Sequence, residues 1–147
     1  MSTLWASVGG RITPADQAVV PALDRGFLFG DAVYEVFSTR RGRPLFWGEH
    51  LDRLRASAAR AGLAPASVDG ATLLAEVQAL CAAVGSEHAY VRLMISRGVN
   101  PGLALDPPSD APLTPTRVLF ARPLTAVDPA LKAHGCALMT TVVPRRD

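Results

Sequence analysis

Alternating apolar and polar positions predict three strands, at residues 32–40, 89–96 and 116–121. In the first strand, one face carries Val33, Glu35 and Phe37, and the other carries Ala32, Tyr34, Val36 and Ser38. The pattern does not decide which of these faces is buried. In the second strand, one face is wholly apolar, with Val91, Leu93 and Ile95, whereas Tyr90 and Arg92 share the other.

Two tight turns predict shorter strands beside these three. Residues 4–8 and 11–12 read as a hairpin around Gly9-Gly10, because paired glycines readily take the positive φ that a tight turn needs. A second turn is predicted at residues 41–43, followed by a returning strand at residues 44–47.

A period of three to four residues predicts two helices. The first spans residues 49–61 and is followed by Gly62, a residue typical of helix C-termini. The second runs from near Asp69, a candidate N-cap, to residue 84, and Gly85 ends it. The apolar faces of the two helices consist of Leu51, Leu54, Ala58 and Ala61, and of Leu73, Leu74, Val77, Leu80, Cys81 and Val84.

The remaining segments lack a clear period. Residues 13–21 read as a connector, and the sequence LDRGFLFGD at residues 23–31 as a bent apolar loop between glycines. Residues 97–115 form a long loop rich in proline and glycine, which is more often functional than structural. Residues 122–128 suit a linker, and residues 134–143 begin a new extended segment.

Composition narrows the class of protein. With 147 residues, 49% of them hydrophobic and 19% charged, the chain is long enough for one domain with a core. The net charge of +2 comes from scattered arginines, so we expect no nucleic-acid partner. We find no signal peptide and no apolar run of membrane-spanning length, and expect a cytoplasmic protein.

Cysteine and histidine add no metal or disulfide site. Cys81 and Cys136 are far apart in apolar contexts, and we expect both to be buried and reduced. His50, His88 and His134 fall on unrelated elements without the spacing of metal ligands. We therefore predict that the protein binds no metal.

The sequences LDRGFLFGDAVYEVF, at residues 23–37, and GEHLDRL, at residues 48–54, carry a family resemblance. They resemble the class IV aminotransferases, the fold-type-IV pyridoxal-phosphate enzymes that include branched-chain and D-amino-acid aminotransferases and aminodeoxychorismate lyase. The resemblance implies an α+β fold: a small N-terminal domain with a mostly antiparallel sheet and two packed helices. It further implies an N-terminal domain at residues 1–121, an interdomain linker at 122–128 and the start of a C-terminal domain at 129–147.

The resemblance also assigns residues to a site. The arginine of the H-x-x-R-L motif, here Arg53, binds the cofactor phosphate in the family. From spacing alone, Arg53 would belong to a solvated basic helix face with His50, Ser57 and Arg60. Tyr34 matches a residue at the wall of the substrate pocket, and Phe29 a neighbouring one. The plainer readings are a half-buried strand tyrosine and a core phenylalanine.

Arg92 stands in the middle of an apolar strand, where a guanidinium needs a partner or a ligand. Branched-chain-type members carry the same Y-x-R pattern, which helps to recognise substrate carboxylates; the alternative is a structural ion pair with Glu35 or Asp31. Gly102 and Ala104 stand where D-amino-acid aminotransferases have an arginine and a histidine, and Ser38 where branched-chain enzymes have an arginine. The substrate side chain therefore stays open.

The family's chemistry needs a lysine that forms a Schiff base with the cofactor. The single lysine, Lys132, is expected on the surface, and the resemblance puts the catalytic lysine beyond Asp147. We thus expect no catalytic residue in this chain, and a homodimer as the working form. The alternatives are aminodeoxychorismate lyase, with which the S-R-G of residues 96–98 is shared, and a non-catalytic binding or oligomerisation module.

Overall fold

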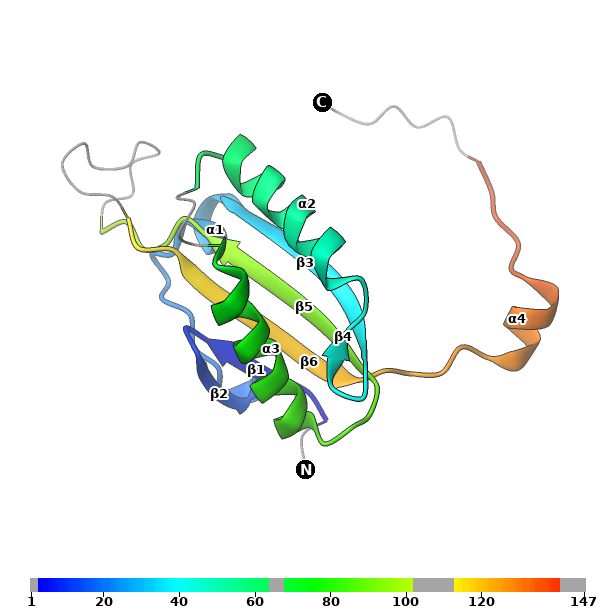
Figure 1. Ribbon diagram of the computed structural model, residues 1–147. Helices are drawn as coiled ribbons and strands as arrows, with labels where there is room; N and C mark the ends of the chain where they lie inside the picture. Colours follow the sequence, from blue (N-terminus) through cyan, green and yellow to red (C-terminus); the bar gives the residue numbers. More distant parts are fainter. Residues whose placement is uncertain (1–2, 64–67, 102–112, 141–147) are drawn as a thin grey trace.

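The computed structural model describes residues 3–63, 68–101 and 113–140. Six strands in this part of the chain form one antiparallel sheet in the order β2-β1-β6-β5-β3-β4 (Figure 1). The strands are β1 (Trp5–Val8), β2 (Arg11–Pro14), β3 (Ala32–Arg40), β4 (Arg43–Pro44), β5 (Ala89–Ser96) and β6 (Thr116–Pro123). The predicted N-terminal hairpin and the three predicted long strands are confirmed, with β6 two residues longer than expected.

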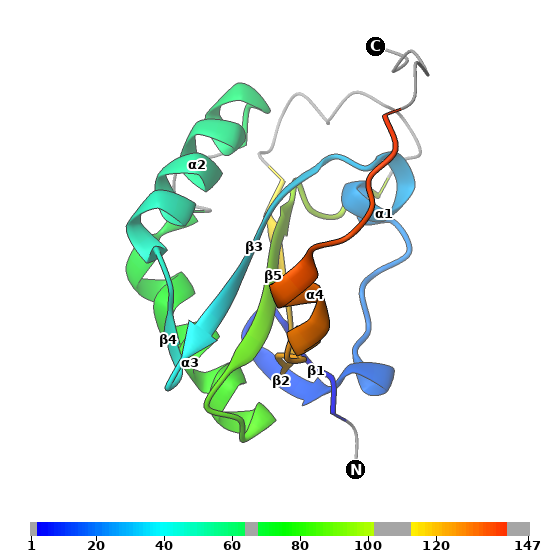
Figure 2. The ribbon, with the colours of Figure 1, turned by 90° about the vertical axis from the view of Figure 1, so that its right-hand side faces the viewer.

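The helices divide between the two sides of the sheet (Figure 2). The two long ones, α2 (Trp47–Arg60) and α3 (Gly70–Val84), cover one face, and the short α1 (Arg25–Phe29) lies on the other side. A short 3-10 helix (Ala15–Gln17) lies within the connector after β2, and α4 (Pro129–His134) follows β6. The predicted α+β class with two packed helices is confirmed.

The hydrophobic core fills the layer between α2, α3 and the sheet. Its strand residues include Phe37, Val91, Leu93, Ile95, Leu119 and Ala121, and its helix residues include Leu54, Ala58, Leu73, Val77, Leu80 and Cys81. The register aligns Glu35 with Leu93 and Leu93 with Leu119, so Glu35 points into this helix-covered layer. The opposite face, with Tyr34, Arg92 and Phe120, carries no long helix among the described residues and is called the open face below.

Both ends of α3 agree with the sequence. The Asp69 carboxylate accepts a hydrogen bond from the backbone N of Thr72 at 2.9 Å, and Gly85 ends the helix with φ 68°. The start of α2 differs from the prediction. The strand expected at residues 44–47 ends at Pro44, because Phe46 takes a left-handed conformation with φ 52° and Trp47 already begins the helix.

The apolar segment expected to be a bent loop contains the helix α1. Asp24 caps its N-terminus by accepting a hydrogen bond from Gly26 N at 2.8 Å, and it also accepts one from Ser96 Oγ at 2.9 Å. Gly30, with φ 67°, ends the helix. A helix of a single turn needs such tertiary support. Gly26 permits the close approach of α1 to Ser96, because a Cβ at residue 26 would overlap the Cβ of Ser96.

The segment after β6 departs from two expectations. Cys136 is exposed instead of buried, whereas Cys81 is buried as predicted, and both are free thiols. Lys132 is exposed, as expected, but it belongs to α4 instead of preceding a strand. Residues 135–140, where an extended segment was expected, contain no assigned strand. None of the helices in the described residues is long and apolar enough to cross a membrane.

Candidate functional site

Arg53 forms a paired hydrogen bond with Glu35. Helix α2 buries Leu54 against the core, and the preceding residue, Arg53, therefore lies on the flank of the helix beside β3. Its Nε donates to Glu35 Oε1 at 3.1 Å and its Nη2 donates to Glu35 Oε2 at 2.6 Å. The Arg53 side chain is nevertheless 61% exposed, so most of the guanidinium faces solvent.

His50 completes this cluster from the preceding turn of α2. Its Nδ1 lies 2.7 Å from Glu35 Oε2 and 2.8 Å from Arg53 Nη2. Burial raises the pKa of the Glu35 carboxyl, but the hydrogen bonds and charges of Arg53 and His50 outweigh burial and hold the pKa below its usual value. Glu35 is therefore a carboxylate at neutral pH, and it in turn raises the pKa of Arg53.

Arg92 and Tyr34 meet on the open face. Their residues lie diagonally across β5 and β3, and the Arg92 guanidinium carbon stacks 4.4 Å from the centre of the Tyr34 ring. Among the described residues, the buried Nε of Arg92 has no hydrogen-bond partner. The Tyr34 side chain, expected to be half-buried if structural, is 57% exposed.

The alternative of a structural ion pair for Arg92 is wrong. Glu35 pairs with Arg53 on the helix-covered face of the sheet. Asp31 pairs with Arg25 Nε at 2.8 Å and with Arg97 Nε at 2.7 Å. Both candidate carboxylates are thus paired with other cations. Among the described residues Arg92 has no ion-pair partner, and its guanidinium stacks on the Tyr34 ring.

The Arg53–Glu35 pair and the Arg92–Tyr34 stack lie on opposite faces of the sheet, at strand β3 and close to an open edge. Tyr34 and Glu35 are consecutive residues of β3, and β4 pairs only with Thr39 and Arg40. The part of β3 that carries Tyr34 and Glu35 thus has a described neighbour strand on one side only, namely β5.

Phe29 lies at the end of α1, where the Arg25 guanidinium carbon stacks 5.1 Å from its ring centre. A pocket of 340 Å³ opens between α1 and the open face. Its lining includes Phe27, Met94, Val118 and Phe120, but not Phe29. Phe27, which is 74% exposed, was not predicted as a site residue, because its exposure depends on how α1 packs against the sheet and has no signal in the apolar pattern.

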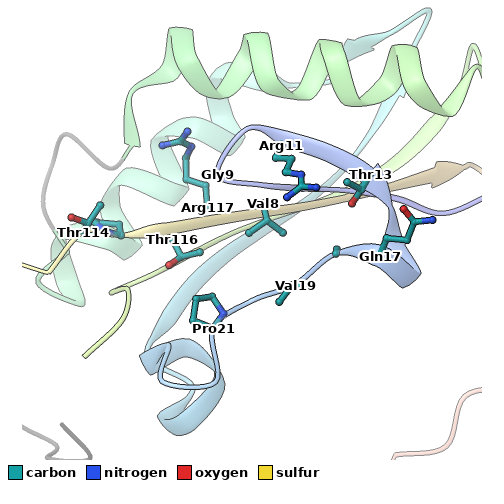
Figure 3. A pocket seen from close by; sticks show the side chains of 12 residues that line it. Val8, Gly9, Arg11, Thr13, Gln17, Val19, Pro21, Thr114, Thr116 and Arg117 are labelled. Atoms are coloured by element: carbon teal, nitrogen blue, oxygen red, sulfur yellow. The ribbon is translucent and has the colours of Figure 1, made fainter. Parts of the chain in front are cut away.

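A second pocket, of 580 Å³, lies between the connector after β2 and strands β1, β2 and β6 (Figure 3). Arg11, Thr13 and Gln17 contribute polar side chains to its lining. The lining contains none of the residues that the motifs predicted, namely Arg53, Tyr34, Arg92 and Phe29. This larger pocket is therefore not the candidate site.

Arg97 ties the helix that carries Arg53 to the start of β3. Its Nη1 donates to Gly62 O at 2.9 Å and its Nη2 to Ala61 O at 2.6 Å, while Nε and Nη2 bind Asp31. Burial raises the pKa of Asp31, but the hydrogen bonds and charges of Arg97 and Arg25 lower it by more. These bonds satisfy carbonyl groups at the C-terminus of α2.

We expect the two paired carboxylates to make the fold sensitive to acid. The pKa values of Asp31 and Glu35 in the folded protein lie below the values of about 3.9 and 4.3 for unfolded chains. Their contribution to the free energy of unfolding is therefore complete above these values and is lost as the pH falls through the folded pKa values. The urea concentration at the midpoint of unfolding should therefore decrease when the pH is lowered below about 4. The double variant Asp31→Asn, Glu35→Gln should show a shallower drop; an equally steep one would contradict the assignment.

Comparisons with known proteins identify the family of this chain. The family model described as amino-transferase class IV matches residues 32–147. A D-alanine aminotransferase from Listeria innocua is 37% identical over 116 residues, which cover 78% of this chain and 39% of the relative. A D-alanine aminotransferase from Listeria monocytogenes is 35% identical over the same shares of the two chains. The chain thus spans about two fifths of the length of these curated relatives.

Solved structures show the same fold. The 4-amino-4-deoxychorismate lyase from Pseudomonas aeruginosa is 32% identical, with a TM-score of 0.68 over 85% of this chain and 42% of that one. The branched-chain aminotransferase from Escherichia coli has a TM-score of 0.69 at 21% identity, over 85% of this chain and 40% of that one. Together with the family match over residues 32–147, this shows that the chain belongs to the class IV aminotransferase family.

Proposed function

We propose that the protein containing this chain is a pyridoxal-phosphate-dependent aminotransferase that moves an amino group from an amino acid to a 2-oxo acid. The observation that carries the proposal is that strand β3 has a cationic side chain beside it on each face of the sheet, Arg53 of α2 on one face and Arg92 of β5 on the other. The exposed guanidinium of Arg53 lies beside Glu35 of β3, and the Arg92–Tyr34 stack lies on the other face of the same strand. The two groups suit the two anions of such a reaction, a phosphate and a substrate carboxylate.

The residues present fit the phosphate of the cofactor. Glu35 binds the Nε and Nη2 edge of Arg53, and Nη1 has no partner among the described residues. A guanidinium with free N–H groups on a helix is well suited to bind a phosphate dianion. We therefore assign phosphate binding to Arg53, as the motif predicted. Solved relatives include an aminotransferase from Mycobacterium tuberculosis in a PLP-bound form, 25% identical to this chain.

The other residues act on the substrate. We assign binding of the substrate carboxylate to the guanidinium of Arg92, which has no ion-pair partner among the described residues, and the exposed Tyr34 ring stacks against it from one side. When bound, pyridoxal phosphate withdraws electrons from the α-carbon of the amino acid, so that a base can remove its proton. We propose that this base is a lysine outside this chain, in a C-terminal domain that begins near residue 129, and that the protein works as a homodimer.

Two observations keep a second candidate, aminodeoxychorismate lyase, in view. A solved lyase shares 32% identity with this chain, and the Ser96-Arg97-Gly98 sequence expected of lyases is present. The substrate of the aminotransferase reading is also open between D-alanine, after the curated relatives, and branched-chain amino acids, after the Y-x-R pattern at Arg92. Gly102 and Ala104, which bear on this choice, lie outside the described residues.

One assay separates these activities. The full protein is incubated with D-alanine or L-leucine in the presence of 2-oxoglutarate and, separately, with aminodeoxychorismate without an amino acceptor. The proposal expects glutamate to form with one of the amino acids. Release of p-aminobenzoate without an acceptor would show the lyase instead, and no turnover of any substrate would favour a non-catalytic module.

A further inference from the structure

Glu35 occupies a buried position in the sheet where an apolar side chain would have a lower desolvation cost. Its β3 neighbours on the same face are Val33 and Phe37, its partner across β5 is Leu93, and Leu54 of α2 lies against the same small gap. A carboxylate in such surroundings loses water, and replacing a buried ion pair with apolar residues is often neutral for stability. Stability of the fold alone therefore does not explain why residue 35 is a glutamate.

The geometry instead ties Glu35 to the orientation of Arg53. A long, exposed arginine side chain ordinarily samples many rotamers. Here two hydrogen bonds to both oxygens of one carboxylate fix the plane of the guanidinium, at 3.1 Å and 2.6 Å. They occupy the Nε and Nη2 edge and leave Nη1 without a partner among the described residues.

His50 fixes the carboxylate in turn. Its Nδ1 lies 2.7 Å from Glu35 Oε2, and its ring packs against Phe37 with 5.2 Å between the ring centres. His50 and Glu35 are both largely buried, with side-chain exposures of 14% and 11%. A buried pair thus supports a guanidinium that is mostly in solvent.

We propose that Glu35, held by His50, is a positioning residue that presents the guanidinium of Arg53 to the phosphate of the cofactor. The inference rests on the proposed function, because it requires that Arg53 binds a phosphate. Neither Glu35 nor His50 contacts the phosphate itself. Their effect is to hold Arg53 in its binding orientation before the ligand arrives, which reduces the ordering cost of binding.

The test compares two ligands that differ only in the phosphate. The dissociation constants of pyridoxal and of pyridoxal phosphate are measured by absorbance on the full protein after removal of its cofactor. The phosphate ratio, the constant for pyridoxal divided by that for pyridoxal phosphate, reports the phosphate contribution. In Glu35→Leu we expect the ratio to fall about tenfold while pyridoxal binds as before. Glu35→Gln, which keeps the shape and one acceptor oxygen, should show a smaller fall in the ratio and serves as the test if the leucine variant does not fold.

Glu76 provides a matched control because it is also a buried glutamate on the helix-covered side. It accepts hydrogen bonds from Ser7 Oγ at 2.6 Å, Gly10 N at 3.0 Å and Arg117 Nε at 3.0 Å, and it does not contact Arg53. Glu76→Leu should lower the melting temperature without changing the phosphate ratio. A fall in the ratio in this control as well would mean that any loss of a buried glutamate disturbs the site, which would overturn the proposal.

The Arg53→Ala variant distinguishes positioning by Glu35 from phosphate binding by Arg53. In the Arg53→Ala background, Glu35→Leu should lower the ratio no further, because Glu35 acts only through Arg53. If Arg53→Ala lowers the ratio but Glu35→Leu and Glu35→Gln leave it within about twofold of the wild type, positioning is refuted and phosphate binding stands. If the wild-type protein binds pyridoxal as tightly as pyridoxal phosphate, both the function and the inference are refuted.

Discussion

Replacing Arg53 with alanine is expected to weaken the binding of pyridoxal phosphate to the full protein about a hundredfold. A guanidinium bound to a phosphate dianion makes charge-assisted hydrogen bonds worth about 1.5–3 kcal/mol each, and about 1.4 kcal/mol corresponds to a factor of ten. Two such bonds account for the expected loss. The measurement is a titration of the cofactor-free protein with pyridoxal phosphate, followed by absorbance.

The control for this prediction is Arg55→Ala on the same helix. Arg55 is also exposed, and its ion pair with Asp52 is a long contact of 3.8 Å within α2. Its removal takes away the same charge but no site contact, so the affinity should stay within about twofold of the wild type. Equal losses in the two variants would indicate that general positive charge, and not Arg53, attracts the phosphate.

Gly98→Ala is expected to destabilise the fold by about 3 kcal/mol. Gly98 has φ 99°, in a region that residues with a side chain rarely adopt, and an added Cβ would overlap the carbonyl oxygen of Thr114. Its backbone is also engaged, because its N–H binds Ser96 Oγ at 3.1 Å and its carbonyl accepts from Arg25 N at 2.9 Å. Relief of the overlap therefore requires movement of the backbone that supports α1.

The free energy of unfolding, measured with urea, tests this prediction against Gly48→Ala. Gly48 lies in α2, where a Cβ would meet no atom within 4 Å, so alanine should be neutral or stabilising by up to about 1 kcal/mol. A Gly98→Ala variant as stable as the wild type would show that the segment after β5 relaxes freely and that its close approach to Thr114 is not required.

The long elements could be predicted from the sequence because their patterns are local. The alternation at residues 89–96 and the caps Asp69 and Gly85 each depend on neighbours within one element. Helix α1 could not be predicted in the same way. Its N-cap residue, Asp24, is supported by Ser96, which lies 72 positions later in the sequence. The left-handed conformation of Phe46, which ends the strand predicted at residues 44–47 early, likewise has no signal in the apolar pattern.

The candidate site was predictable in its cations but not in their partners. The motif indicated Arg53, and the polar interruption of an apolar strand indicated Arg92. The pairing of Glu35 with Arg53 instead of Arg92 depends on which face of β3 is buried, and the alternation alone left both faces open. Once Glu35 is known to face α2, a residue of opposite charge on that helix becomes its expected partner.

We propose that the full protein binds its cofactor on a lysine outside this chain. The most direct measurement is to add pyridoxal phosphate to the full protein, reduce with borohydride and locate the modified lysine by peptide mass spectrometry. We predict one stoichiometric adduct on a lysine beyond Asp147. An adduct on Lys132, or no stoichiometric adduct at all, would contradict it.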